Sequence, residues 1–167
     1  GFKFKLSTLV LPIILVGSLL RLFAKGRIAR AGYALAGFGL LFVGIAFLQE
    51  GMSTLQGAAF FTNFPADTFS GRIRLVLVGM LFTVVTQSSS AGVASALTAV
   101  FTGLISFEQA AAMVIGMDVG TTVTAAMATI GGSVDARRTG FSHVIYNFLT
   151  GIFALIILSP YMALWEQ

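Results

Sequence analysis

Long apolar runs that follow one another with little charge between them constrain this chain more than any other feature. The first run, 6–24, is interrupted by a single charged residue, Arg21. About 20 apolar residues at a rise of 1.5 Å each cross the hydrocarbon core of a bilayer, so this run is long enough to span. Only 10% of the 167 residues are charged and 57% are hydrophobic, whereas a soluble domain carries about 25% charged residues. The chain is therefore predicted to be an integral protein of the cell (inner or plasma) membrane, with the lipid bilayer as its solvent.

The composition also excludes several classes of function. There is no cysteine, so neither disulfides nor cysteine-based metal sites are available. The net charge of +4 forms no basic patch interleaved with aromatic residues, so nucleic acid is not an expected partner. The first run is not a typical signal peptide, because no small-residue cleavage site precedes a polar mature domain. The chain starts at Gly1 rather than Met, which is compatible with a fragment or a processed product.

Charged and helix-breaking residues divide the chain into three parts. We expect a leading transmembrane helix and basic loop over 1–32, a repeat unit over 33–158 and a tail over 159–167. Within the unit the sequence predicts, in order, a glycine-rich helix at 33–48, an interfacial loop at 50–71, a re-entrant hairpin at 72–105, a broken helix at 108–130, a loop at 131–138 and a final helix at 140–158. Ser106 followed by Glu108 is typical of a helix start. Glycines such as Gly37, Gly39 and Gly44 let membrane helices approach closely.

The hairpin prediction rests on four contiguous polar residues, Gln87-Ser88-Ser89-Ser90. They lie between apolar runs of 13 residues (73–85) and 15 residues (91–105), both too short for a comfortable span. The two runs form either one long helix with serines in its middle or two short helices with the serines at the tip. With a re-entrant hairpin, the unit 33–158 crosses the membrane three times.

A hairpin tip of this composition would suit an oxyanion. The helix that starts near Ala91 would offer free N–H groups and the positive end of its dipole beside three hydroxyls and one amide. A second interruption at 116–122 would offer carbonyls, two threonine hydroxyls and the carboxylate of Asp118 to a small cation. An acid inside an apolar run is costly and is by default a functional hypothesis. Paired helix breaks of this kind are typical of secondary transporters.

Structural roles remain open for the same residues. Serines and threonines in membrane helices often hydrogen-bond to their own backbone or to a neighbouring helix. Asp118 could sit at a helix end, and Gly116 and Gly120 could serve helix packing alone.

The remaining polar candidates are interpreted as structural. His143 and Asn147 are four residues apart and share a helix face, which predicts a hydrogen-bonded pair rather than a proton carrier. Ser88–Ser90 lack a preceding glycine and an adjacent histidine, so no serine protease and no enzyme is predicted. Glu50 and Glu108 are expected to be solvated charges at helix ends.

Three segments in order resemble the sodium–phosphate cotransporter family, the group that includes the type II transporters. They are TQSSSA at 86–91, GLISFEQAAAMVIGMDVGTTVTA at 103–125 and GGSVDARRTGFSHVIYN at 131–147. The resemblance covers 70–158 and implies an all-α membrane fold made of two inverted repeats, each with a QSSS hairpin and a broken helix. This chain would be one half, most like the second repeat, and 6–24 would be the tail of the first half or a connecting helix.

The resemblance implies sodium-coupled uptake of inorganic phosphate, with Na+ as the coupling ion. The implied phosphate ligands are Gln87, Ser88, Ser89 and Ser90. The implied sodium ligands are Thr86, Asp118, Thr121 and Thr122.

Two departures from the family pattern bear on function. Asp118 and Val119 stand where the family usually has Asn-Ile, and the added charge would strengthen cation binding, repel phosphate or add a titrating group. Only one QSSS segment is present, so either the chain is half of a longer protein or a second copy completes it as an antiparallel homodimer. The alternative function is a non-transporting scaffold or sensor subunit, and a third is a channel-like pore.

The membrane orientation follows from the distribution of positive charge. The loops 21–30 and 131–139 hold six Lys/Arg, and the opposite side holds four, Lys3, Lys5, Arg72 and Arg74. The excess predicts that the first two loops face the cytoplasm.

Overall fold

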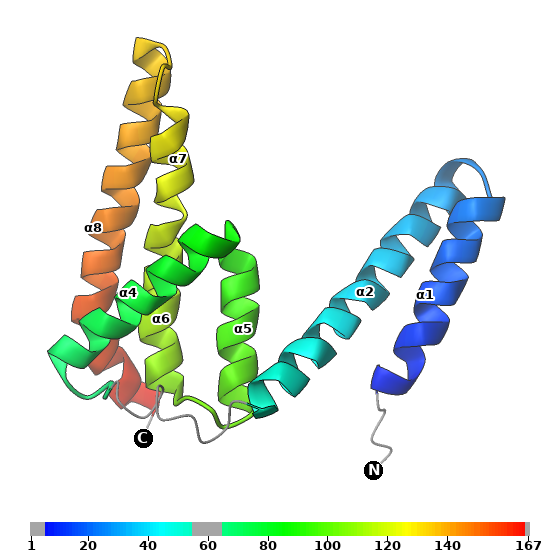
Figure 1. Cartoon of the computed structure of the whole chain (residues 1–167), viewed down its shortest axis with the longest axis horizontal. Coiled ribbons are helices and arrows are strands. Elements are labelled where there is room, and N and C mark those ends of the chain that lie inside the picture. Colours follow the sequence, from blue (N-terminus) through cyan, green and yellow to red (C-terminus); the bar gives the residue numbers. More distant parts are fainter. Residues whose placement is uncertain (1–5, 55–64, 166–167) are drawn as a thin grey trace. The chain divides into compact units, whose positions relative to one another are not determined.

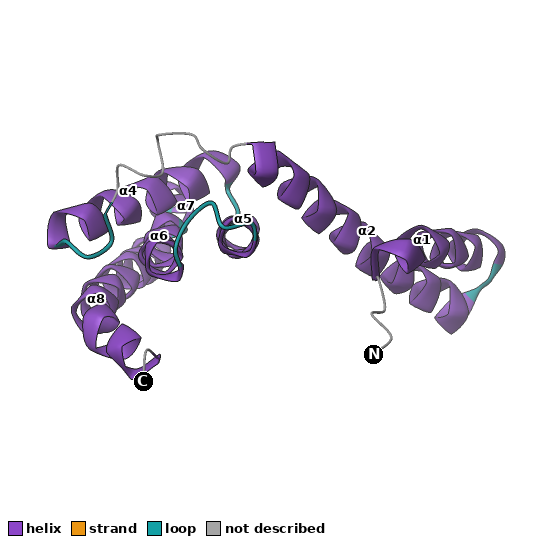
Figure 2. Ribbon diagram, turned by 90° about the horizontal axis from the view of Figure 1, so that it is seen from below, coloured by secondary structure: helices purple, strands orange, loops and turns teal. Residues whose placement is uncertain are grey.

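The computed structural model describes residues 6–54 and 65–165, and every regular element in these ranges is a helix (Figure 1, Figure 2). The helices are α1 (Leu6–Phe23), α2 (Gly26–Thr54), α4 (Phe69–Thr86), α5 (Ser89–Phe101), α6 (Phe107–Gly120), α7 (Thr122–Ala128) and α8 (Val134–Trp165). In the described ranges, α2, α4, α6 together with α7, and α8 are each long and apolar enough to cross a membrane. The prediction of an all-α integral membrane protein is confirmed.

The chain forms two compact units, one ending at Thr54 and the other beginning at Leu55. In the first unit, α1 and α2 form a tight antiparallel pair. A Cβ on Gly17 would lie 2.5 Å from the backbone nitrogen of Ala36, and one on Gly32 would lie 2.7 Å from the carbonyl oxygen of Gly17. The two backbones are therefore in direct contact, as small residues in membrane helices allow.

Two details of the first unit differ from the sequence-based expectation. The basic loop expected over 21–30 is reduced to Ala24 and Lys25, because Gly26 adopts φ +62 and turns the chain straight into α2. Of the three glycines expected to pack, Gly39 approaches a side chain of α1, whereas Gly37 and Gly44 meet no atom within 4 Å. The assignment of 33–48 to the repeat unit stays a prediction, since the described contacts of α2 are with α1.

In the second unit, α4 and α5 form two separate helices rather than one long helix. Thr68 caps the start of α4 by accepting a hydrogen bond from the Gly71 N–H at 3.1 Å. Gln87 ends α4 in the left-handed region with φ 58, and Ser88 is the N-cap of α5, which begins at Ser89. The 13 residues of α5 extend about 20 Å, well short of a bilayer core. The re-entrant position of this hairpin in the membrane stays a prediction.

The second interruption is narrower than the sequence predicts. Only Thr121 separates α6 from α7, and it keeps helical angles of φ −62 and ψ −24. Gly116 does not unwind the helix, because it serves a close contact with α4: a Cβ there would lie 2.7 Å from the carbonyl carbon of Val76 and would overlap its oxygen. Gly79 makes the reciprocal contact, 2.8 Å from the carbonyl carbon of Met113. In Figure 1, α4 crosses α6 obliquely.

The last helix is longer than predicted at both ends. The loop expected at 131–138 ends at Ser133, with Gly131 at φ +74 making the turn, and α8 then runs on to Trp165 through Pro160. The expected tail at 159–167 is thus helical as far as it is described. Leu158 and Met162 are buried, and Arg72 of α4 donates a hydrogen bond to the hydroxyl of Ser159, so tertiary contacts hold these last turns.

Local signals at other ends behave as predicted. Ser106 caps α6 in a full capping box with Gln109, and Glu108 lies in the first turn. Glu50 is exposed in the last turns of α2. Several expectations lie outside the described residues: those for Lys3 and Lys5 and for the loop residues 55–64.

Candidate functional site

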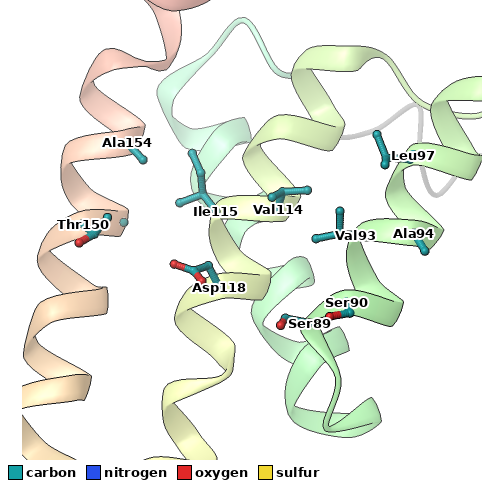
Figure 3. Close-up of a pocket in the computed structure, with 11 residues that line it drawn as sticks. Ser89, Ser90, Val93, Ala94, Leu97, Val114, Ile115, Asp118, Thr150 and Ala154 are labelled. Carbon is teal, nitrogen blue, oxygen red and sulfur yellow. The ribbon is translucent and has the colours of Figure 1, made fainter. Parts of the chain in front are cut away.

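A cavity of about 610 Å³ opens between α5, α6 and α8, and it contains the polar residues that the sequence singled out on two of these helices (Figure 3). Ser89 and Ser90 come from α5, Asp118 from α6 and Thr150 from α8. The rest of the wall is apolar or lacks a side chain, and is made of Val93, Ala94, Leu97, Val114, Ile115, Gly151 and Ala154. Three polar surfaces from distant segments thus face one largely apolar space.

The α5 side of the cavity is built to donate hydrogen bonds. Ser88 is the N-cap and accepts a hydrogen bond from the Ala91 N–H at 3.2 Å, so Ser89 and Ser90 form the first turn. Within the described residues, neither Ser89 nor Ser90 has a hydrogen-bond partner for its side chain. Free hydroxyls beside the positive end of a helix dipole favour an anionic ligand.

The α6 side has the opposite character. The carboxylate of Asp118 forms no ion pair or hydrogen bond in the part of the chain that the structure describes. Asp118 is exposed in the described chain, and an acid within a membrane segment is by default a functional hypothesis.

Thr150 of α8 complements Asp118. Its hydroxyl proton is committed to the carbonyl oxygen of Tyr146 at 2.8 Å. A hydroxyl whose proton is used in this way presents its oxygen lone pairs to the cavity as an acceptor. In Figure 3, Asp118 is drawn between Thr150 and the two serines, so the acceptor oxygens of Asp118 and Thr150 lie on one side and the serine hydroxyls on the other.

The other predicted residues at the hairpin tip do not line this cavity. Gln87 is committed to the end of α4, where its side-chain amide donates to the carbonyl oxygen of Val84 at 2.9 Å. Thr86 donates its hydroxyl to Phe82 O at 2.8 Å. The binding roles of Thr86, Gln87 and Ser88 stay predictions, and in this conformation the three residues shape the turn that presents Ser89 and Ser90.

The two threonines at the interruption also bond within their own segment. The Thr121 hydroxyl donates to Asp118 O at 2.5 Å, and the buried Thr122 hydroxyl donates to Val119 O at 2.7 Å. Neither residue lines the cavity. Their sodium-binding roles stay predictions.

Sequence reasoning missed two residues. Thr150 lies seven residues after His143 and three after Asn147, so the helical periodicity that linked those two residues could have found it. Thr83 is 2% exposed, and its hydroxyl has no hydrogen-bond partner among the described residues. It packs on the last residue of α6, since a Cβ on Gly120 would lie 3.0 Å from the Thr83 Cβ. No sequence pattern distinguishes this threonine from one that bonds to its own helix.

The predicted pair of His143 and Asn147 is confirmed as a hydrogen-bonding element of α8. The Asn147 amide is buried, donates to His143 O at 2.9 Å and lies 3.3 Å from the ring Nδ1. Neither side chain lines the cavity.

Comparison with known proteins places this arrangement in context. The model of a family described as Na+/Pi-cotransporter matches residues 2–50 and 43–164. The chain is 30% identical to "Uncharacterized protein YqeW" of Bacillus subtilis over 165 residues, which cover 95% of this chain and 52% of that protein. It is 25% identical to "Putative inorganic phosphate export protein YjbB" of Salmonella typhimurium over 172 residues, which cover 98% of this chain and 30% of that protein. The chain thus spans about half or less of these relatives' length. No solved structure matches it.

Proposed function

The chain belongs to the Na+/Pi-cotransporter family, and we propose that the cavity between α5, α6 and α8 forms part of a site at which inorganic phosphate and sodium bind for transport across the membrane. The observation that carries this proposal is that Ser89, Ser90 and Asp118 line one cavity although they come from different helices. No covalent chemistry is needed for this function.

The ligands divide by charge. Phosphate oxygens accept hydrogen bonds from the hydroxyls of Ser89 and Ser90, next to the start of α5. Sodium takes oxygen ligands from Asp118 and Thr150, because the carboxylate has no protein partner among the described residues and the Thr150 proton is already used. Carbonyl and carboxylate oxygens at helix breaks are typical cation ligands in secondary transporters.

This division also provides a basis for coupling. With no cation present, the negative charge of Asp118 opposes a phosphate anion in the same cavity. A bound sodium ion offsets that charge and therefore raises the affinity for phosphate. By linkage, phosphate raises the affinity for sodium by the same factor.

The complete site requires more than this chain. The chain spans 52% of the length of the YqeW protein, and we propose that a second repeat unit or a second copy supplies the remaining ligands. The family resemblance leads us to propose an inverted, antiparallel arrangement of the two. Cross-linking that captured only parallel pairs would contradict the arrangement without affecting the cavity assignment.

We propose uptake of phosphate under an inward sodium gradient. The name of the YjbB protein refers to export, so both directions have to be measured. In a coupled carrier the direction follows the sum of the two gradients, and reversal of the sodium gradient should reverse the flux.

The test uses proteoliposomes that contain only this chain. Labelled phosphate uptake is measured with an inward sodium gradient and with potassium in its place, and phosphate binding to the purified chain is measured in the same two salts. Ser89→Ala and Ser90→Ala should each weaken sodium-dependent binding. The matched control is Ser142→Ala, an exposed serine of α8 outside the cavity.

The outcomes separate the alternatives. Sodium-dependent, saturable uptake means that copies of this chain assemble into a carrier. Sodium-dependent binding without uptake means that the site is present and a second half is missing. Well-folded protein with neither property supports the scaffold or sensor subunit. If both serine variants bind as the control does, the cavity is not the phosphate site.

A further inference from the structure

The end of the first unit at which α1 turns into α2 contains a second polar cavity, of about 640 Å³. Arg21 in the last turn of α1, Lys25 in the turn and Arg30 in α2 line it, together with Tyr33. We propose that this cavity binds a phosphate group at the membrane surface, supplied by an anionic lipid headgroup or by free phosphate. The proposal does not depend on the transport site.

The positive charge at this end of the first unit is not balanced by a carboxylate among the described residues. Within the described residues of the first unit, the only acid is Glu50, and neither Arg21, Lys25 nor Arg30 forms an ion pair. Glu50 lies about 30 Å from Arg30 along α2, at 1.5 Å per residue. Three cations therefore converge on one cavity without a carboxylate to neutralise them, which favours an anionic ligand.

The chemistry of the side chains favours phosphate in particular. The planar guanidinium groups of Arg21 and Arg30 can each donate two parallel hydrogen bonds to phosphate oxygens, and Lys25 adds a point charge. A carboxylate would use fewer of these donors than a tetrahedral anion.

The surroundings favour a lipid headgroup over free phosphate. Leu22 and Phe23 are adjacent to Arg21 and are 74% and 81% exposed, and Tyr33 is 71% exposed. Apolar side chains beside cations, with a tyrosine at the border, are the pattern of a membrane interface. Basic pockets between membrane helices are known to bind anionic headgroups.

The chain offers a matched control for charge. Arg27 lies between Lys25 and Arg30 in the sequence but does not line the cavity. Arg30→Gln and Arg27→Gln remove the same charge from the same helix, so a difference between them reports the cavity and not the net charge. Arg30→Lys keeps the charge and removes the planar fork.

The experiment titrates the full-length purified chain in a neutral detergent with phosphatidylglycerol, with phosphatidylcholine and with inorganic phosphate, and follows thermal unfolding and lipid binding by native mass spectrometry. Phosphatidylglycerol should bind and raise the melting temperature. Arg21→Gln and Arg30→Gln should each weaken its binding by about fivefold, as expected for one cation near a membrane surface. The affinity of Arg30→Lys for phosphatidylglycerol should lie between those of Arg30→Gln and the unaltered chain, and Arg27→Gln should bind as the unaltered chain does.

Each outcome decides a point. If only phosphatidylglycerol stabilises the chain, the site binds a lipid headgroup. If inorganic phosphate stabilises the chain equally, and this effect is lost in Arg30→Gln but kept in Ser90→Ala, the site binds the free anion. Equal weakening by Arg27→Gln and Arg30→Gln overturns the proposal, because charge alone would then explain binding. The proposal is also overturned if the folded chain binds none of the three ligands. Failure of phosphate transport in the Ser90→Ala variant leaves this result unaffected.

Discussion

Replacement of Gly116 by alanine tests the contact on which the second unit depends. The added Cβ would lie 2.7 Å from the carbonyl carbon of Val76, and ordinary contact begins at 3.4 Å. The two backbones would therefore have to separate by more than about 0.7 Å at this point, because the carbonyl oxygen of Val76 lies closer still. No side chain can move aside to prevent it, because the obstructing atoms belong to the α4 backbone.

The expected cost is that of overpacking a tight interface, about 1–3 kcal/mol. Alanine also stabilises a helix by roughly 0.5–1 kcal/mol relative to glycine, which would mask part of the cost. Gly44→Ala is the matched control, because that glycine also lies inside a helix but meets no atom within 4 Å. The difference between the two variants cancels the helix term and leaves about 1–3 kcal/mol, a factor of roughly 5–150 in the folding equilibrium.

The assay is equilibrium unfolding of the purified chain and of each variant in one mixed-micelle system. Gly79→Ala, on the facing surface of α4, should behave as Gly116→Ala does, since its Cβ would lie 2.8 Å from the carbonyl carbon of Met113. If Gly116→Ala and Gly79→Ala were both as stable as Gly44→Ala, the backbone contact between α4 and α6 would not exist in the folded protein, and the position of Asp118 relative to the hairpin would have to be revised.

Three further predictions test single residues. Asp118→Asn introduces the amide that the family resemblance leads us to expect. It should raise the half-saturating sodium concentration at least tenfold, while phosphate binding at saturating sodium persists. An unchanged sodium dependence would exclude the carboxylate as a sodium ligand. Gln87→Val should destabilise the hairpin by about 1–2 kcal/mol and Gln87→Gly should not, because φ is 58 at this position and glycine adopts the left-handed region without strain. If the two variants had equal unfolding curves, the left-handed turn would be contradicted. Ser106→Ala should cost about 1 kcal/mol through loss of the N-cap of α6, measured by the same unfolding assay.

The sequence predicted best those features that depend on neighbouring residues. The helix start at Ser106 follows from side chains within two or three positions of each other, and the structure adds the capping box with Gln109. The membrane class followed from composition. In the site, the chemistry of Ser89, Ser90 and Asp118 is enough to predict them as candidate ligands, and the structure shows that they line one cavity.

The features that the sequence missed depend on distant contacts. Gly116 is compatible with either an unwound turn or a packed helix, and only the Val76 backbone decides between them. The predicted final helix ends at residue 158, yet the contact between Arg72 and Ser159 and the burial of Met162 continue α8 past Pro160. Thr150 entered the site only because α8 returns alongside α6.

The buried hydroxyl of Thr83 has a consequence for the balance between conformations. A buried hydroxyl without a hydrogen-bond partner raises the free energy of the state that contains it by about 1–3 kcal/mol. Any rearrangement of α4 against α6 that brings the hydroxyl to an acceptor recovers this energy, and so shifts the ratio of the two states by roughly 5–150-fold. The described packing is therefore held below its attainable stability at the contact next to Gly120, and a threonine outside the cavity lining can set how readily the unit leaves this conformation.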